Sequence, residues 1–287
     1  MIVGPTGVGK TKLSIELAKR MNAEIINGDS VSIYEGLDIG SAKPTKEERR
    51  EVPHHLIDIR KVEEDYSVYD YQKDARKKMK EITERGKRVI IVGGTGLYIK
   101  AALYDYRFYE EKEKNFYEGM TNEELYEKIK TYTKENLPSP NNRRRLERLL
   151  QKLELGQEIE QHKDDLMYDI EVIGLTTDRD VLYQRINDRV DQMVKNGLLE
   201  EIEQLKAFYP KSRILNSGIG YKEFRNYLFE NQSLEETLEE VKRNSRRFAK
   251  RQYTFFHHQF PTTWYDVDFK DFNQTIEKVY EQIKKEA

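Results

Sequence analysis

The chain begins with a glycine-rich loop that limits which folds it can adopt. Residues 4–11 read Gly-Pro-Thr-Gly-Val-Gly-Lys-Thr and satisfy the pattern G-x-x-x-x-G-K-[ST]. The apolar pair Ile2-Val3 precedes the loop, and an amphipathic segment from Lys10 to about Met21 follows it. A strand, a phosphate loop and a helix in this order are typical of a βαβ unit. The sequence therefore predicts an α/β fold with a phosphate-binding site near its N-terminus.

Later segments continue the same alternation of strands and helices. Apolar runs predict strands at 24–27, 56–59, 88–92, 170–175 and 263–265. Ser67 and Asp70 resemble a capping box that opens a helix ending at Gly86. Between 109 and 165 the sequence is charge-rich and helical, with no convincing strand. We expect a P-loop NTPase-like core of parallel strands flanked by helices, formed by 1–108 and 166–287, with a helical insertion at 109–165.

The composition excludes several classes of protein. Charged residues make up 36% of the 287 residues, the net charge is -2, and there is no cysteine. No apolar run approaches the roughly 18 residues of a membrane span. Without cysteine there is neither a disulfide framework nor a thiolate metal site. We expect a cytoplasmic monomer that does not interact with a membrane.

The phosphate loop has residues for each part of diphosphate binding. Converging backbone N–H groups and a helix N-terminus favour an anion, the Lys10 ammonium neutralises charge, and the Thr11 hydroxyl can be a ligand of Mg²⁺ or Mn²⁺. The loop residues concerned are Gly4, Thr6, Gly7, Val8, Gly9, Lys10 and Thr11. A chance glycine-rich turn is the alternative, which the flanking strand and helix disfavour.

A hydrolase of nucleoside triphosphates usually also has an acid after an apolar strand. Here the strand at 88–92 is followed by Gly93-Gly94-Thr95, without a carboxylate. Asp58 is either a substitute for that acid or a structural residue. This weakens the prediction of nucleotide hydrolysis.

Asp29 and Thr95 each follow a predicted strand, so both should lie at the same edge of the sheet as the phosphate loop. Asp29 is either a general base or a turn former. Thr95 either contacts a bridging phosphate oxygen or caps the next helix.

Three groups of cations also need an explanation. Arg185 and Arg189 share one helical face and are either a second cationic wall for the diphosphate or a solvated surface. Arg143, Arg144, Arg145 and Arg148 follow a turn in the insertion. Five further cations lie on one face of a late helix and favour contact with an RNA backbone, although a surface helix optimised for its dipole would look similar: Arg243, Arg246, Arg247, Lys250 and Arg251.

Several motifs together closely resemble the tRNA dimethylallyltransferases, also called tRNA isopentenyltransferases. The stretches that carry the resemblance are 4–11, 29–44 and 92–98, with further matches at 140–142, 218–221 and 250–254. The resemblance spans nearly the whole chain in order. Because cysteine is absent, the C-terminal zinc finger of some eukaryotic members is excluded, and a bacterial-type enzyme is indicated.

The resemblance implies a reaction and roles for individual residues. The phosphate loop would bind dimethylallyl diphosphate with Mg²⁺, and the acceptor would be N6 of the adenosine 3′ to the anticodon in a tRNA anticodon stem-loop. Asp29 would accept the amine proton and Thr95 would contact the bridging oxygen, with Arg185 and Arg189 as further diphosphate contacts. The implied tRNA contacts are Asp29, Ser30, Val31, Ser32, Arg144, Arg145, Arg148, Gly220, Tyr221, Lys250, Arg251 and Gln252.

Three other functions remain open on the residues alone. A P-loop small-molecule kinase would use Asp29 as the base for a hydroxyl group. A transferase that prenylates free AMP would have no use for the basic helix. A nucleotide-gated RNA-binding protein would form no covalent product.

Overall fold

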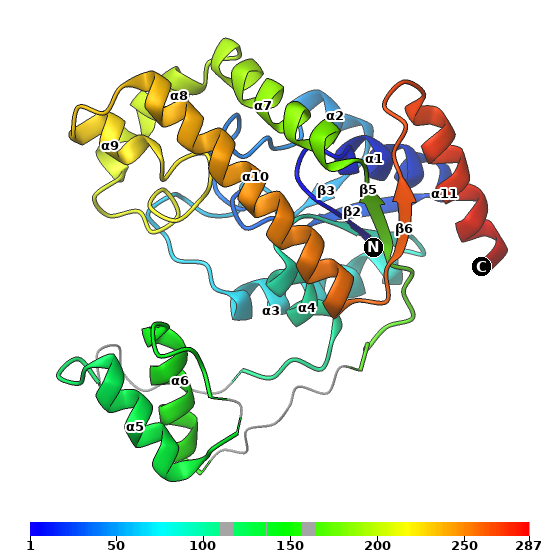
Figure 1. Ribbon diagram of the computed structural model, residues 1–287. Helices are drawn as coiled ribbons and strands as arrows, with labels where there is room; N and C mark the ends of the chain where they lie inside the picture. The colour runs from blue at the N-terminus through cyan, green and yellow to red at the C-terminus, as the bar shows by residue number, and fades with distance from the viewer. Residues whose placement is uncertain (109–116, 136, 157–164, 287) are drawn as a thin grey trace. The chain divides into compact units, whose positions relative to one another are not determined.

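The computed structural model describes residues 1–108, 117–135, 137–156 and 165–286. A six-stranded sheet forms the centre of the larger of two compact units, Met1–Leu103 with Tyr168–Ala287 (Figure 1). Its strand order is β3-β2-β4-β1-β5-β6, and neighbouring strands pair in parallel throughout. The strands are β1 Ile2–Val3, β2 Ala23–Asn27, β3 His54–His55, β4 Arg88–Val92, β5 Ile173–Thr176 and β6 Thr263–Asp266. The expected parallel α/β core is confirmed.

Helices cover both faces of this sheet. On one face α1 packs beside α11, and on the other α3 packs beside α4 (Figure 1). The longest helix, α10, contacts α4, α7 and α9. No helix in the described ranges is both long and apolar enough to cross a membrane. The helices of this unit are α1 Lys10–Met21, α2 Lys46–Glu51, α3 Val68–Glu84, α4 Gly96–Leu103, α7 Arg179–Lys195, α8 Leu198–Leu205, η1 Lys206–Phe208, α9 Phe224–Phe229, α10 Leu234–Gln259 and α11 Phe272–Glu286.

The second compact unit is Tyr104–Met167. It contains α5, Asn122–Tyr132, and α6, Arg143–Glu154, which enclose a small apolar core. The core residues are Tyr117, Leu125, Ile129, Leu146 and Leu150. The insertion expected at 109–165 falls inside this unit, and its stretches 109–116 and 157–164 lie outside the described residues.

Local sequence signals set several of the helix starts. Ser67 accepts a hydrogen bond from the backbone of Asp70, whose side chain accepts one from Ser67 in return, and this confirms the predicted capping box. The strand expected at 56–59 is wrong. Leu56 and Asp58 have φ angles of 60° and 54°, a left-handed conformation that cannot continue an extended strand. The strand in this region is instead β3, two residues earlier.

A buried carboxylate anchors the amino end of β2. The Glu24 side chain is 5% exposed and accepts bonds from His55 Nε2 at 2.6 Å, Arg85 at 2.7 Å and Lys87 Nζ at 2.8 Å. Burial alone would raise the pKa of Glu24, but hydrogen bonds from Lys87 and His55 and the charges of Arg85 and Lys87 outweigh it and lower the pKa to about 2. The carboxylate therefore stays charged in the folded protein at any ordinary pH.

Replacing Glu24 by glutamine should lower the free energy of unfolding by about 3 kcal/mol, because Arg85, Lys87 and His55 lose their shared carboxylate. The folded pKa lies below the unfolded value of 4.5, so this stability is present above pH 4.5 and is lost as the pH falls toward about 2. Urea unfolding at neutral pH measures the change. Glu16→Gln is the control, since its ion pair with Lys19 is exposed. Equal stability of the two variants would contradict this role of Glu24.

Candidate active site

The phosphate loop runs from β1 to α1 with a backbone that only glycine adopts easily. Gly4, Gly7 and Gly9 have φ angles of 140°, 84° and 103°. Gly9 is the N-cap of α1 and gives no side-chain cap, so the first N–H groups of the helix are left for an anion. The Val8 side chain is buried, so its backbone is the part that can contribute. The loop therefore has the backbone geometry of an anion site.

Lys10 lies folded against this loop. Its Nζ donates to the carbonyl oxygens of Gly4 at 2.9 Å and Pro5 at 2.8 Å. An ammonium group has three protons, so one remains for a ligand. Burial lowers the pKa of Lys10 to about 8, which the negative charge of Asp29 opposes and the positive charge of Arg189 reinforces. A bound anion would favour the charged form of Lys10.

Helix α7 brings two arginines to the same loop. Arg189 donates from its guanidinium to Thr6 Oγ1 at 3.3 Å. Arg185 donates from Nε to the Gly7 carbonyl at 3.3 Å, and its guanidinium lies 3.7 Å from the centre of the Phe269 ring. The spacing along α7 left open whether these residues form a solvated face, whereas the structure places both against the phosphate loop.

Asp29 and Thr95 are brought together where β2 and β4 end. Val31 N donates to Asp29 Oδ1 at 3.1 Å, and the neighbouring Ser30 N donates to Thr95 Oγ1 at 2.9 Å. The Thr95 hydroxyl donates in turn to Ser30 Oγ at 3.2 Å. Burial raises the pKa of Asp29, against the opposing effects of the Val31 N–H and the charges of Lys10 and Arg189. A raised pKa makes this carboxylate a better proton acceptor than an ordinary aspartate.

Gln252 connects the phosphate loop to the turn after β4. Its Oε1 accepts from Thr6 N at 2.9 Å, and its Nε2 donates to the Gly94 carbonyl at 3.1 Å. A Cβ atom on Gly94 would lie 1.9 Å from Gln252 Nε2 and 3.5 Å from Asp29 Oδ2, so these three residues are immediate neighbours. The Gln252 side chain is buried and its amide is occupied by protein groups. The contacts of Gln252 join the two loops of the site, and its expected contact with tRNA stays a prediction.

The other expected tRNA contacts divide by exposure. Gly220, Tyr221 and Ser32 are buried in the unliganded chain. Ser30 and Val31 are partly exposed beside Asp29. The exposed cations among the expected contacts are Lys250 and Arg251 on α10 and, in the smaller unit, Arg144, Arg145 and Arg148 on α6.

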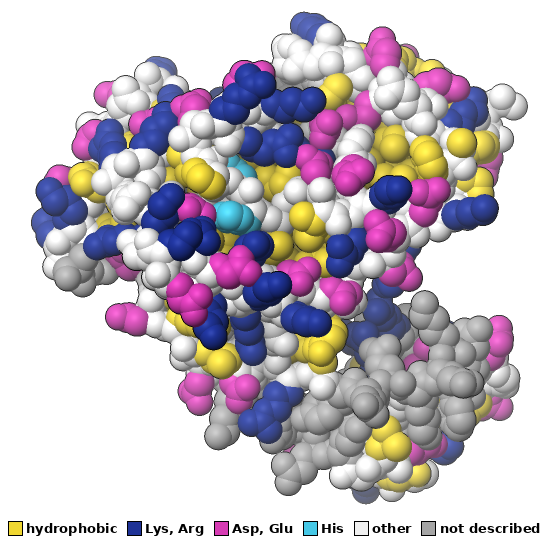
Figure 2. Space-filling model, turned by 180° about the vertical axis from the view of Figure 1, so that it is seen from behind, with side chains coloured by type: hydrophobic (Ala, Val, Ile, Leu, Met, Phe, Trp, Pro, Cys, Tyr) yellow, Lys and Arg dark blue, Asp and Glu magenta, His cyan; other side chains and the backbone are white. Residues whose placement is uncertain are grey.

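Some of the remaining basic side chains have protein partners. Arg243 pairs with Glu240 at 3.0 Å, and Arg246 donates to Asn187 at 2.5 Å. In the rear view, Lys and Arg alternate with Asp and Glu over most of the surface (Figure 2). A polyanion on this face would therefore meet charges of both signs.

The residues present suit a hard cation that is held mainly by the oxygens of a bound phosphate group. Within the described part of the chain, no group of three or more His, Cys, Asp or Glu is arranged to hold a metal ion. Mg²⁺ commonly takes few protein ligands and shares the oxygens of a bound phosphate. Thr11 is partly exposed in the first turn of α1 and offers such a hydroxyl. A Mg²⁺ ion bound jointly by Thr11 and a diphosphate fits this donor set.

Asp58 is not free to replace the missing strand-end acid. Its two carboxylate oxygens pair with Lys43 at 2.5 Å and with Arg49 at 2.6 Å. The pKa of Asp58 is lowered because these partners outweigh the effect of burial. Asp58 is therefore a structural residue of this loop region.

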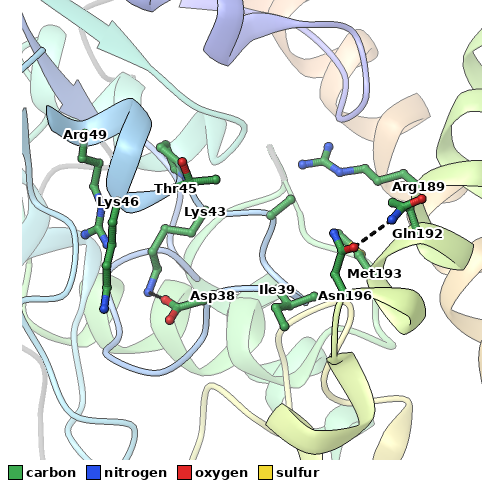
Figure 3. Close-up of a pocket in the computed structure, with 12 residues that line it drawn as sticks. Asp38, Ile39, Lys43, Thr45, Lys46, Arg49, Arg189, Gln192, Met193 and Asn196 are labelled. Carbon is green, nitrogen blue, oxygen red and sulfur yellow. Dashed lines mark hydrogen bonds and ion pairs between the residues drawn. The ribbon is translucent and has the colours of Figure 1, made fainter. Parts of the chain in front are cut away.

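A cavity of about 340 Å³ lies beside Arg189, away from its contact with Thr6. Figure 3 shows Lys43 turned toward Asp38 on one side and Arg189 entering from α7 on the other. The lining comes from α2, α7 and the segment that precedes α2: Asp38, Ile39, Ala42, Lys43, Pro44, Thr45, Lys46, Arg49, Arg189, Gln192, Met193 and Asn196. Arg189 thus borders both the phosphate loop and this cavity.

Comparison with known families agrees with the motifs. The family described as IPP transferase matches residues 32–259. A tRNA dimethylallyltransferase of Anoxybacillus flavithermus is 43% identical over 296 residues, which cover 99% of this chain and 95% of that protein. One from Bacillus anthracis is 45% identical over 282 residues, covering 93% and 90%. The resemblance seen in the motifs is confirmed.

Solved structures give the same result. A tRNA delta(2)-isopentenylpyrophosphate transferase from Staphylococcus epidermidis is 38% identical, covers 100% of this chain and 98% of its own, and has a TM-score of 0.76. A eukaryotic dimethylallyltransferase acting on tRNA is 29% identical with a TM-score of 0.85, covering 97% of this chain and 76% of its own. The similarity therefore extends over the whole chain in three dimensions.

Proposed function

This chain belongs to the IPP transferase family, and on that premise we propose that it transfers a dimethylallyl group from dimethylallyl diphosphate to N6 of the adenosine 3′ to the anticodon of tRNA. As a member of this family it is a tRNA prenyltransferase. The observation that supports the detailed reaction is the contact chain from Thr6 through Gln252 to Gly94, which lies against Asp29. These contacts hold the phosphate loop next to the carboxylate of Asp29, which can act as the base.

The reaction needs a donor held by its diphosphate and an amine that loses a proton. The N6 lone pair attacks the allylic carbon, the bond from that carbon to the bridging oxygen breaks, and pyrophosphate leaves with the bonding electrons. Asp29 accepts the proton released by the amine, which its raised pKa favours. Thr95 lies at the same edge, and its hydroxyl would donate to the bridging oxygen in place of Ser30 Oγ, to which it donates in the unliganded chain.

Negative charge grows on the departing pyrophosphate. The loop N–H groups, Lys10, Arg185 and Arg189 form the preorganised positive environment for it. Mg²⁺, when bound with Thr11, supplies further neutralisation of phosphate charge. The side chains named for both steps belong to one chain, so we expect the monomer to be active. Because the substrate is tRNA, we also expect the protein to work in the cytoplasm.

The acceptor RNA requires a cationic surface and a base removed from its stack. Lys250 and Arg251 are exposed on α10, the helix that carries Gln252. We assign these two residues, together with Arg144, Arg145 and Arg148 of the smaller unit, to the RNA backbone. The kinase and the nucleotide-gated RNA-binding protein gain no support from the relatives compared above, which are named as transferases.

Nucleoside mass analysis of RNA after reaction tests this function. The protein is incubated with Mg²⁺, dimethylallyl diphosphate and an anticodon stem-loop RNA, and in a parallel reaction with AMP as the acceptor. We expect one dimethylallyl group on the adenosine 3′ to the anticodon and none on AMP. Unmodified RNA, or modification of AMP instead, would contradict the proposal, as would phosphoryl transfer in a third reaction that contains ATP in place of dimethylallyl diphosphate.

A further inference from the structure

A carboxylate of α8 is surrounded by backbone N–H groups of the loop that follows Asp29. We name residues Ser30–Pro44 the 30–44 loop. Glu201 Oε2 accepts from Asp38 N at 3.0 Å and Ile39 N at 2.8 Å, and Glu201 Oε1 accepts from Gly40 N at 3.0 Å. Successive backbone N–H groups that converge in this way form an anion-binding concavity. Here the bound anion is a side chain of the protein itself.

Tyr221 extends this group of hydrogen bonds, which we call the clamp and which consists of Glu201, Tyr221 and the backbone N–H groups of 38–41. Its hydroxyl donates to Glu201 Oε1 at 2.8 Å and accepts from Ser41 N at 3.1 Å. The ring is fully buried, and burial together with the neighbouring Glu201 charge raises the pKa of the Tyr221 phenol, so it remains a neutral donor. Four consecutive backbone N–H groups, those of 38–41, are therefore tied to one carboxylate and one phenol.

The clamped loop begins at the active site and continues to the cavity beside Arg189. At its start, Ser30 N bonds Thr95 and Val31 N bonds Asp29. Farther along, Asp38 and Ile39 line the cavity that Arg189 also borders. Glu201 itself contacts neither the phosphate loop nor Asp29 through any bond seen in the described residues. It can affect the reaction only through the shape of the 30–44 loop.

We propose that Glu201 is a positioning residue of the transfer reaction. It holds residues 38–41 in place, so that the 30–44 loop, which begins beside Asp29, keeps its shape. This inference rests on the proposed function. A carboxylate is well suited to the task because hydrogen bonds to a charged acceptor are roughly twice as strong as neutral ones. Glutamine at this position would also turn a donating NH₂ group toward backbone donors.

Glu201→Gln tests the inference, with Glu203→Gln on the same helix as the matched control. Glu203 pairs with Lys206 in an exposed i,i+3 pair at 3.2 Å, so its loss should matter little. For Glu201→Gln, we expect kcat/KM for stem-loop RNA to fall on the order of 10–100-fold, as a loop displaced by about 1 Å would cause. The dissociation constant of dimethylallyl diphosphate should stay as in the control, whereas the Tm should fall because four hydrogen bonds to a carboxylate are weakened or lost.

Amide hydrogen exchange without any substrate tests the clamp separately from the reaction. We expect Glu201→Gln to lose protection at the amides of 38–41, while the amides of β1 and β4 stay protected. Unchanged protection at 38–41, or wild-type kcat/KM, would overturn the inference. If wild-type protein transfers nothing to RNA, the proposed function fails, whereas the exchange result still reports on the clamp.

A second variant covers the case in which Glu201→Gln loses its fold. Tyr221→Phe removes only the hydroxyl that joins Ser41 N to Glu201. It should lower kcat/KM for RNA in the same direction but less, with faster exchange at Ser41 and an unchanged donor dissociation constant. If Tyr221→Phe shows wild-type kinetics and exchange, the proposed role of the clamp is wrong.

Discussion

Replacing Asp29 by asparagine is expected to lower kcat/KM for transfer to stem-loop RNA by about 10²–10⁴-fold, the usual contribution of a general base. Asparagine keeps the shape of the side chain and an oxygen for the Val31 N–H, which donates to Asp29 Oδ1 at 3.1 Å. What it lacks is the ability to accept a proton. The loss should therefore appear in transfer kinetics, while the dissociation constant of dimethylallyl diphosphate and the Tm change little.

The pH dependence of the same reaction gives an independent test of Asp29. The base must be deprotonated, so kcat/KM should rise as the pH increases through the pKa of Asp29. Because burial raises that pKa, this acid limb should lie above the range of an ordinary aspartate. The limb should vanish in Asp29→Asn and persist in Asp188→Asn, an exposed aspartate of α7. Wild-type kcat/KM in Asp29→Asn would rule out this residue as the base.

Lys10→Met should weaken pyrophosphate binding and lower kcat by about 10²–10³-fold, the usual cost of one preorganised donor at a site of developing charge. The ammonium now bonds two carbonyl oxygens of the loop and has one proton left for the diphosphate. Methionine keeps much of the length of the side chain but brings neither charge nor donor. Calorimetry with pyrophosphate measures the first effect, and single-turnover transfer measures the second.

The pKa of Lys10 predicts how pyrophosphate binding changes with pH. In the unliganded protein that pKa is about 8, so the positive charge is present below pH 8 and is lost as the pH rises through that value. As the pH rises through about 8, pyrophosphate binding by the wild type should weaken more than binding by Lys10→Met. Lys19→Met, an exposed change two turns further along α1, is the control. Equal pyrophosphate affinity of Lys10→Met and this control would refute the proposed role of Lys10.

Local patterns predicted the part of the fold that depends on near neighbours. The phosphate loop, the helix after it and the capping box at Ser67 each depend on a few consecutive residues, and each was predicted at the right place. The prediction of a strand at 56–59 was wrong because Leu56 and Asp58 adopt a left-handed backbone conformation, which their residue types do not indicate. An apolar run alone cannot reveal such a conformation.

Contacts between distant segments explain the rest. Gln252 lies 246 residues from Thr6, and Glu201 lies 161 residues from Gly40. No local spacing could pair them, so the sequence did not predict that Gln252 and Tyr221 are buried and bonded to distant segments. The raised pKa of Asp29 was equally hidden, because it arises from burial that only the folded chain creates.

The tight packing after β4 restricts how this family member could change its chemistry. A Cβ on Gly93 would lie 2.2 Å from the carbonyl carbon of Gly28, and one on Gly94 would lie 1.9 Å from Gln252 Nε2. An aspartate that could activate water for nucleotide hydrolysis would have to enter at this strand end. At Gly93 a side chain would meet the backbone of Gly28, and at Gly94 it would force the Gln252 side chain out of its contacts. The contacts that assemble the transferase site thus disfavour a hydrolytic acid at either of these two glycines.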